Sequence, residues 1–273
     1  MHYTMEEPFK QLIFIPAREN LIKFHDEREQ VIRICRDINS YSKKLIFSCH
    51  RITKKQIDNS IQKQIDDYLN ILADKLLQIN EVTRSCNFAN YKSTISNAIE
   101  EMIEGFTFLF YIINEKLLTY QQLLSIVDRL ISKSWNSCLE LFVDHESEIN
   151  ITSEFIFEGD YFMGIFDLTG EIMRCSISNL IDDDTKSINP LVIKNLQFLQ
   201  SINRNLSDLF LIYPNLNVNK GQFNISFNSK GCGAIKKKME VLKQSLDKVQ
   251  TTVCDISIRS QEFPGNCVLE DYL

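Results

Sequence analysis

The sequence contains little glycine or proline and has no long uninterrupted hydrophobic run. Its 273 residues include 8 glycines and 5 prolines, so regular structure is broken at few points. The most apolar stretch, residues 106–113, is interrupted by Thr107 and is shorter than the about 20 residues that a membrane-spanning helix needs. We therefore expect no membrane-spanning segment and no membrane partner.

Cysteine and histidine are present without the spacing that metal centres require. The 8 cysteines form no CxxC pair, and none of the 4 histidines lies at ligand spacing from another, so each histidine is interpreted as an isolated surface residue. The first residues show no basic segment followed by a hydrophobic one, the pattern of a secretory signal. These features favour reduced thiols and a cytoplasmic location, with the nucleus also open.

The motifs of several enzyme classes are missing as well. There is no recognisable Ser-His-Asp or Cys-His arrangement, and no Walker or Rossmann glycine pattern. The net charge of −6 does not indicate a nucleic-acid-binding protein. Any binding of nucleic acid must therefore depend on a local basic patch.

What the sequence does contain is long segments of 3.6-residue hydrophobic periodicity, which predict an all-α protein with seven helices. We expect one helical domain over 19–262, an irregular segment over 1–18 and a tail over 263–273. The expected helices cover 19–54, 58–80, 90–114, 119–141, 159–182, 190–213 and 234–259, with loops over 142–158 and 214–233.

The last of these helices carries a heptad seam over three repeats. Apolar residues recur at spacings of four and three: Ile235, Met239, Leu242, Leu246, Val249, Val253 and Ile256. This seam is compatible with packing inside the bundle or against another subunit.

The helix that begins near Gly159 confines its polar residues to one narrow strip. At about 100° per residue, Asp160, Asp167, Glu171 and Arg174 fall within roughly 60° of one another, and most of the remaining circumference is apolar. A buried carboxylate without a partner is unstable. We therefore expect a metal ion, a basic partner or a water-filled cavity beside this strip.

Two helices each offer a close pair of carboxylates: Glu101 with Glu104, and Asp167 with Glu171. If these helices face each other, four oxygen ligands converge, and Mg²⁺ and Mn²⁺ prefer such ligands. Carboxylates that hold these ions can support phosphodiester hydrolysis. The alternative is that the acids are structural, ion-paired or solvent-facing, which is common on bundle helices.

A basic stripe follows the first long helix, within an arc of about 120° opposite its apolar face. Its members are Arg33, Arg36, Lys43, Lys44, Arg51, Lys54 and Lys55. We regard Arg36, Lys43, Lys44 and Arg51 as candidates for contacts with nucleic-acid phosphates. An ordinary solvated helix face is the alternative.

Three segments resemble the translin family: residues 25–52 (HDEREQVIRICRDINSYSKKLIFSCHRI), 159–174 (GDYFMGIFDLTGEIMR) and 236–259 (KKKMEVLKQSLDKVQTTVCDISIR). The similarity runs from about residue 20 to 262, and the DLTGE pattern within it is the specific part. That pattern resembles the catalytic subunits of the family rather than translin itself.

The resemblance implies a seven-helix all-α fold that assembles with translin subunits into a barrel-like hetero-octamer enclosing single-stranded RNA. It implies an Mg²⁺-dependent endoribonuclease that removes passenger strands in RNA silencing or processes transfer-RNA precursors. The family's catalytic and metal-binding acids map onto Glu101, Glu104, Asp167 and Glu171. Two other hypotheses remain: a non-catalytic subunit that binds single-stranded RNA or DNA or acts as a scaffold, and a helical interaction module without nucleic acid.

Overall fold

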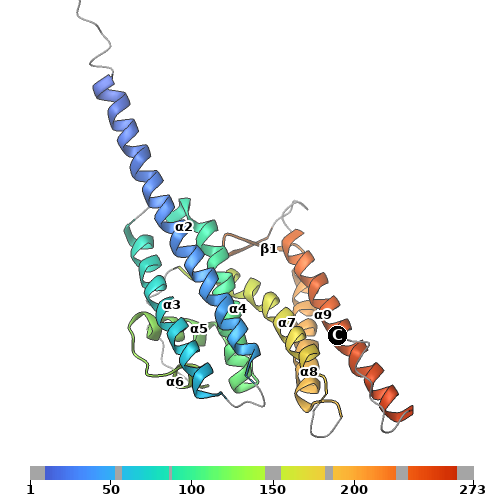
Figure 1. Ribbon diagram of the computed structural model, residues 1–273. Helices are drawn as coiled ribbons and strands as arrows, with labels where there is room; N and C mark the ends of the chain where they lie inside the picture. The colour runs from blue at the N-terminus through green and yellow to red at the C-terminus, as the bar shows by residue number, and fades with distance from the viewer. Residues whose placement is uncertain are drawn as a thin grey trace, which may run out of the picture.

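The chain folds into long helices that pack side by side (Figure 1). The computed structural model describes residues 10–52, 57–85, 88–144, 155–181, 187–225 and 233–262. Within these ranges the α-helices are α2 (Ile15–His50), α3 (Asn59–Ser85), α4 (Lys92–Asn114), α5 (Tyr120–Ile131), α6 (Cys138–Leu141), α7 (Glu158–Ser178), α8 (Pro190–Ile212) and α9 (Gly233–Glu262). A π-helical turn (η1, Lys10–Phe14) precedes α2, and a 3₁₀ turn (η2, Phe88–Asn90) precedes α4. The all-α prediction is confirmed, with eight α-helices in the described ranges where seven were expected.

Several helix boundaries differ from those expected. Helix α2 begins at Ile15, earlier than the predicted residue 19, and it tolerates Pro16 in its first turn, where a missing N–H group is harmless. It ends at His50 rather than residue 54. Helix α3 continues to Ser85 and buries Val82, whereas α7 ends at Ser178, before the expected residue 182. The expected tail, 263–273, lies outside the described residues.

The single helix expected over 119–141 is wrong, because α5 and α6 are separate helices. The cause is local: Lys133 adopts a left-handed conformation with φ 52° and ends the helix. Ser137 then caps α6 by accepting a hydrogen bond from the Glu140 N–H.

The expected loop over 214–233 contains an antiparallel hairpin, β1 (Leu216–Asn219) paired with β2 (Gln222–Ile225). Its two turn residues, Lys220 and Gly221, have φ of 50° and 75°, the combination that matches the twist of paired strands. The Gly159 N–H donates to the Gly221 carbonyl oxygen at 3.0 Å, so the hairpin closes over the start of α7.

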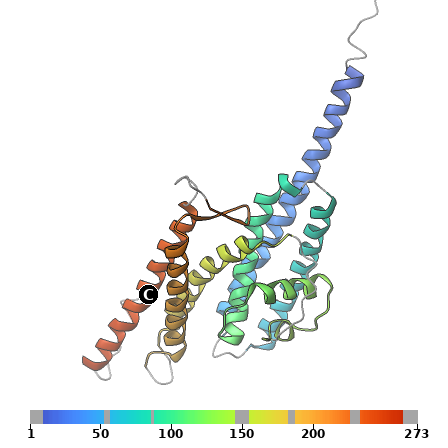
Figure 2. The ribbon, with the colours of Figure 1, turned by 180° about the vertical axis from the view of Figure 1, so that it is seen from behind.

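The helices follow one another in space as α3, α2, α4, α7 and then α9 with α8, which both views show (Figures 1 and 2). The heptad seam of α9 packs within this bundle against α7 and α8, with Leu242 and Val249 fully buried. The first turns of α2 extend beyond the other helices, and none of residues 15–30 is buried (Figure 1).

Helices α4 and α7 approach closely at Gly164. A methyl group there would lie 2.6 Å from Cγ2 of Ile103 and 3.3 Å from the backbone oxygen of Glu100. The missing side chain at Gly164 thus sets the distance between the two helices that carry the predicted acids.

We predict opposite effects from two alanine substitutions in α7. Gly164→Ala forces α4 and α7 apart and should lower the free energy of unfolding by about 1–3 kcal/mol. Gly170→Ala meets no atom within 4 Å and should raise it by about 0.5–1 kcal/mol through helix propensity. Urea unfolding of the two variants measures both effects, and equal effects would contradict the assigned role of Gly164.

Candidate functional site

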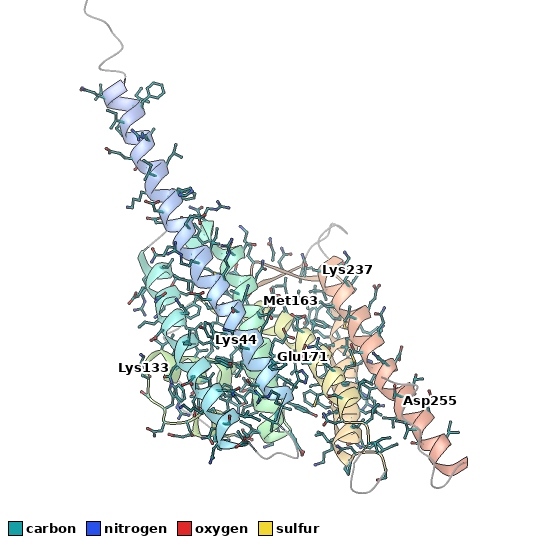
Figure 3. The ribbon with its side chains drawn as sticks, in the orientation of Figure 1. Lys44, Lys133, Met163, Glu171, Lys237 and Asp255 are labelled. Carbon is teal, nitrogen blue, oxygen red and sulfur yellow. The ribbon has the colours of Figure 1, made fainter. Side chains whose placement is uncertain are left out.

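A hollow of about 590 Å³ lies between α2, α4 and α7. Its lining residues are Lys43, Ile46, Phe47, His50, Glu101, Glu104, Glu171, Arg174 and Ser178. Figure 3 marks Glu171 on α7, beside α4, and Lys44 on the neighbouring α2. Three of the four predicted acids therefore share one cavity, and they come from two helices that do face each other.

Asp167, the fourth predicted acid, does not line this hollow. It lies on α7 one turn before Glu171, and its half-exposed side chain is directed to α9, where it meets Lys238. Burial is the main cause that raises the pKa values of Glu100, Glu101 and Glu104, and the charge of Asp167 contributes to each. The acids thus form one electrostatic group with two parts. We call Glu101 and Glu171, on the side of α2, the first flank, and Asp167 and Glu100, on the side of α9, the second flank.

Basic side chains from α2 and α7 contact the acids of the first flank. His50 Nε2 lies 2.5 Å from the Glu171 carboxylate, and the Arg174 guanidinium lies 3.0 Å from it. Lys43 Nζ lies 3.6 Å from Glu101. These contacts explain how Glu171 is tolerated at 7% exposure, because a buried carboxylate requires charged or hydrogen-bonding partners.

Lys238 of α9 neutralises the second flank. Its ammonium lies 2.7 Å from Asp167 and 3.6 Å from Glu100, and it donates to the Met163 carbonyl oxygen at 3.1 Å. The residues Met163 and Glu171 mark the two ends of this stretch of α7 in Figure 3.

Glu104 lies between the flanks, and its carboxylate has no ion pair or hydrogen bond within the part of the chain that the structure describes. Burial raises the pKa of Glu104 to about 8, with further contributions from the charges of Asp167, Glu101 and Glu171. Burial likewise raises the pKa of Glu100 to about 7, against the opposing effect of Lys238. A cation placed beside the hollow would therefore favour the ionised form of Glu104.

Comparison with known proteins identifies the family of this helical arrangement. The family model described as Translin family matches residues 26–260. The chain belongs to the translin family.

Similar translin-family proteins come from mammals and yeast. The rat protein named Translin-associated protein X is 25% identical over 260 residues, covering 95% of this chain and 82% of the rat protein. Its mouse counterpart is 24% identical over the same length and with the same coverage. The Translin-associated protein X homolog of Schizosaccharomyces pombe is 24% identical over 246 residues, covering 87% of this chain and 84% of the yeast protein. The predicted resemblance is thereby confirmed.

The donor chemistry of this translin-family site suits a hard divalent cation, because every candidate ligand is a carboxylate oxygen. As the side chains stand, however, the described ranges contain no group of three or more His, Cys, Asp or Glu residues that could hold a metal ion. Lys238 draws Asp167 toward α9, whereas His50 and Arg174 hold Glu171 on the other flank. Unpaired Glu104 beside a hollow is the feature that fits an added cation.

The basic residues of α2 differ in their contacts. Arg36, Lys43, Lys44 and Arg51 are all exposed, and of these four Lys43 lines the hollow. Lys44 lies over the ring of Tyr41, 4.2 Å from its centre, and Arg51 donates to Gln64 of α3 at 2.9 Å. Lys54 and Lys55 lie outside the described residues. The assignment of these residues to nucleic-acid binding stays a prediction.

Sequence reasoning missed three members of the site. His50 was expected at the surface, but its side chain is 17% exposed because it packs on Phe108 and pairs with Glu171. Lys238 and Glu100 were not considered as site residues. The sequence did contain a signal for Lys238. It lies three residues after Ile235 and four before Leu242, so it shares a helix face with these apolar seam residues.

In the described part of this translin-family chain, no helix is both long and apolar enough to cross a membrane.

We predict that the stability of this translin-family chain falls as pH rises through the site's titration range. The folded pKa of Glu104 is raised from 4.5 to about 8, so the unfolded chain releases this proton first and stability declines between these values. Glu104→Gln should therefore melt at a higher temperature than the wild type at pH 8 and at a similar temperature at pH 5. Thermal unfolding at both pH values measures this effect. The matched control is Glu81→Gln on the exposed surface of α3, and a parallel shift in that variant would refute the explanation.

Proposed function

We propose that this chain is the catalytic subunit of a divalent-metal-dependent endoribonuclease that cleaves single-stranded RNA in complex with translin. The observation that supports it is the unpaired Glu104 carboxylate, placed in a hollow with Glu101 and Glu171 and electrostatically coupled to Asp167. We propose Mg²⁺ as the ion, with Mn²⁺ as an alternative, and a cytoplasmic or nuclear role in RNA silencing or in transfer-RNA precursor processing.

In this proposal Glu101, Glu104, Asp167 and Glu171 hold the metal. When bound, a divalent cation lowers the pKa of its water and neutralises the charge that develops on the phosphate. Lys43 and Arg174 line the hollow with side chains 68% and 66% exposed, so in this proposal both can contact RNA phosphates in addition to their partners Glu101 and Glu171. Ile46 and Phe47 also line the hollow and provide an apolar surface that an RNA base can contact.

Association with translin is supported by two observations. The relatives carry the name Translin-associated protein X, which states such an association for them. In addition, the end of η1 and the first turns of α2 expose Phe14, Leu21 and Ile22 at 62%, 69% and 48%. A helix end with this much exposed apolar surface is typical of a protein–protein interface.

We predict that Glu104→Gln and Asp167→Asn each reduce RNA cleavage by the complex at least a hundredfold while leaving assembly unchanged. Both substitutions remove an anionic ligand and preserve side-chain volume. Cleavage of a labelled single-stranded RNA, alongside gel filtration, measures the two properties. Glu81→Gln should cleave at the wild-type rate, and EDTA should stop cleavage; wild-type activity in Asp167→Asn would remove Asp167 from the site.

A second candidate function is a non-catalytic RNA-binding or scaffolding subunit. It is favoured by the basic partners of Glu101, Asp167 and Glu171, which give these acids a structural role without a metal. This function would replace the first if the complex bound single-stranded RNA but cleaved none at any Mg²⁺ or Mn²⁺ concentration.

Under both functions we predict that Lys43→Gln flattens the dependence of log affinity for single-stranded RNA on log salt concentration by about one unit. The reason is that one phosphate contact, and the counterion that it releases, is lost. Fluorescence anisotropy at several salt concentrations measures the slope. The control is Lys133→Gln. This residue lies on the side of the molecule formed by α3 and α5 (Figure 3), and its substitution should leave the slope unchanged.

A further inference from the structure

Lys238 is the one basic residue that α9 places against the predicted metal ligands in the described part of the chain. Its ammonium donates to Asp167 Oδ2 at 2.7 Å and to the Met163 carbonyl oxygen at 3.1 Å, and it forms a longer ion pair with Glu100 Oε2 at 3.6 Å. An ammonium group has three donors and no acceptor, so these two hydrogen bonds use two of its donors, and the ion pair with Glu100 adds charge attraction.

The position of Lys238 follows from the packing of α9. Ile235 and Leu242, three residues before and four after it, are 2% and 0% exposed and anchor this part of α9 in the bundle. Because residues at these spacings share a helix face, Lys238 is directed at α7 rather than at solvent. Its side chain is 23% exposed, whereas the adjacent Lys237 is exposed and has no ion pair among the described residues.

This ion pair separates Asp167 from the other predicted ligands. Asp167 is bound on the α9 side, whereas Glu101, Glu104 and Glu171 line the hollow. A divalent cation ligated by Asp167 would stand within a few ångströms of the ammonium and be repelled by it. Lys238 and the cation therefore cannot both have their best contact with this carboxylate.

We propose that Lys238 is a resident counter-cation that competes with the divalent metal for Asp167, so that α9 controls how tightly the site binds metal. The inference rests on the proposed function, because it assumes that Asp167 is a metal ligand. Metal binding then proceeds by exchange: the Lys238 ammonium leaves Asp167, keeps Glu100 and the Met163 carbonyl as acceptors, and frees one carboxylate for the ion. Glu100 thus receives a role as the acid that retains the displaced lysine.

The first test measures Mn²⁺ affinity of the full-length chain, purified with its partner subunits, by the electron paramagnetic resonance signal of free Mn²⁺. Lys238→Met should bind Mn²⁺ about tenfold more tightly, since a charge-assisted contact no longer has to be broken. Lys238→Arg should stay close to the wild type. Lys237→Met is the matched control, because it removes the same charge from the same helix without touching Asp167, and its affinity should stay within about twofold of wild type.

A second measurement uses the unmodified protein and does not depend on the folding of a variant. Acetylation of lysines by an amine-reactive ester, read by mass spectrometry, should become several-fold faster at Lys238 when Mn²⁺ is added. Lys237 provides the internal reference. Unchanged reactivity of Lys238 at saturating Mn²⁺ would overturn the exchange.

The outcomes separate this inference from the proposed function. If Lys238→Met tightens Mn²⁺ binding but the complex cleaves no RNA, the nuclease function fails and the competition stands. If the complex cleaves RNA but Lys238→Met binds Mn²⁺ no more tightly than wild type, the competition fails and the nuclease function stands. Absence of Mn²⁺ binding in both proteins would overturn the inference.

Discussion

The close packing of α4 against α7 is the contact on which the site depends. Gly164 allows it, because a larger residue there would collide with Ile103. Bringing these two helices together also brings together Glu101 and Glu104 with Glu171, which repel one another. The apolar contact between the helices must therefore outweigh the repulsion, and the neighbouring elements must reduce it.

That reduction comes from elements on both sides of the pair. Helix α2 contributes Lys43 and His50, and α9 contributes Lys238. The outer helices are thus more than a hydrophobic cover, because they carry the charges that make a carboxylate cluster stable in the bundle. Glu104 remains without such a partner among the described residues, which leaves the cluster able to accept a further positive charge.

Most of the architecture was predictable because helix formation depends on local periodicity. Residues of the predicted apolar seam, such as Leu242 and Val249, are fully buried. The errors occurred where the φ angle of a single residue decides where a helix ends or where a turn begins. Lys133 separates α5 from α6 and Lys220 starts the hairpin turn, each with a left-handed conformation that lysine rarely adopts and that no pattern announced.

By itself, the sequence determined most of the helices, the family and two close pairs of acids on separate helices, because these follow from residue type and from spacing within one element. Only the tertiary structure decided which charge meets which acid. His50 and Glu171 are 121 positions apart, and Lys238 and Asp167 are 71 apart. Such pairs depend on how whole helices pack, and no local pattern contains that information. For the same reason the split of the acids into two flanks, with Asp167 held by α9, emerged only from the folded bundle.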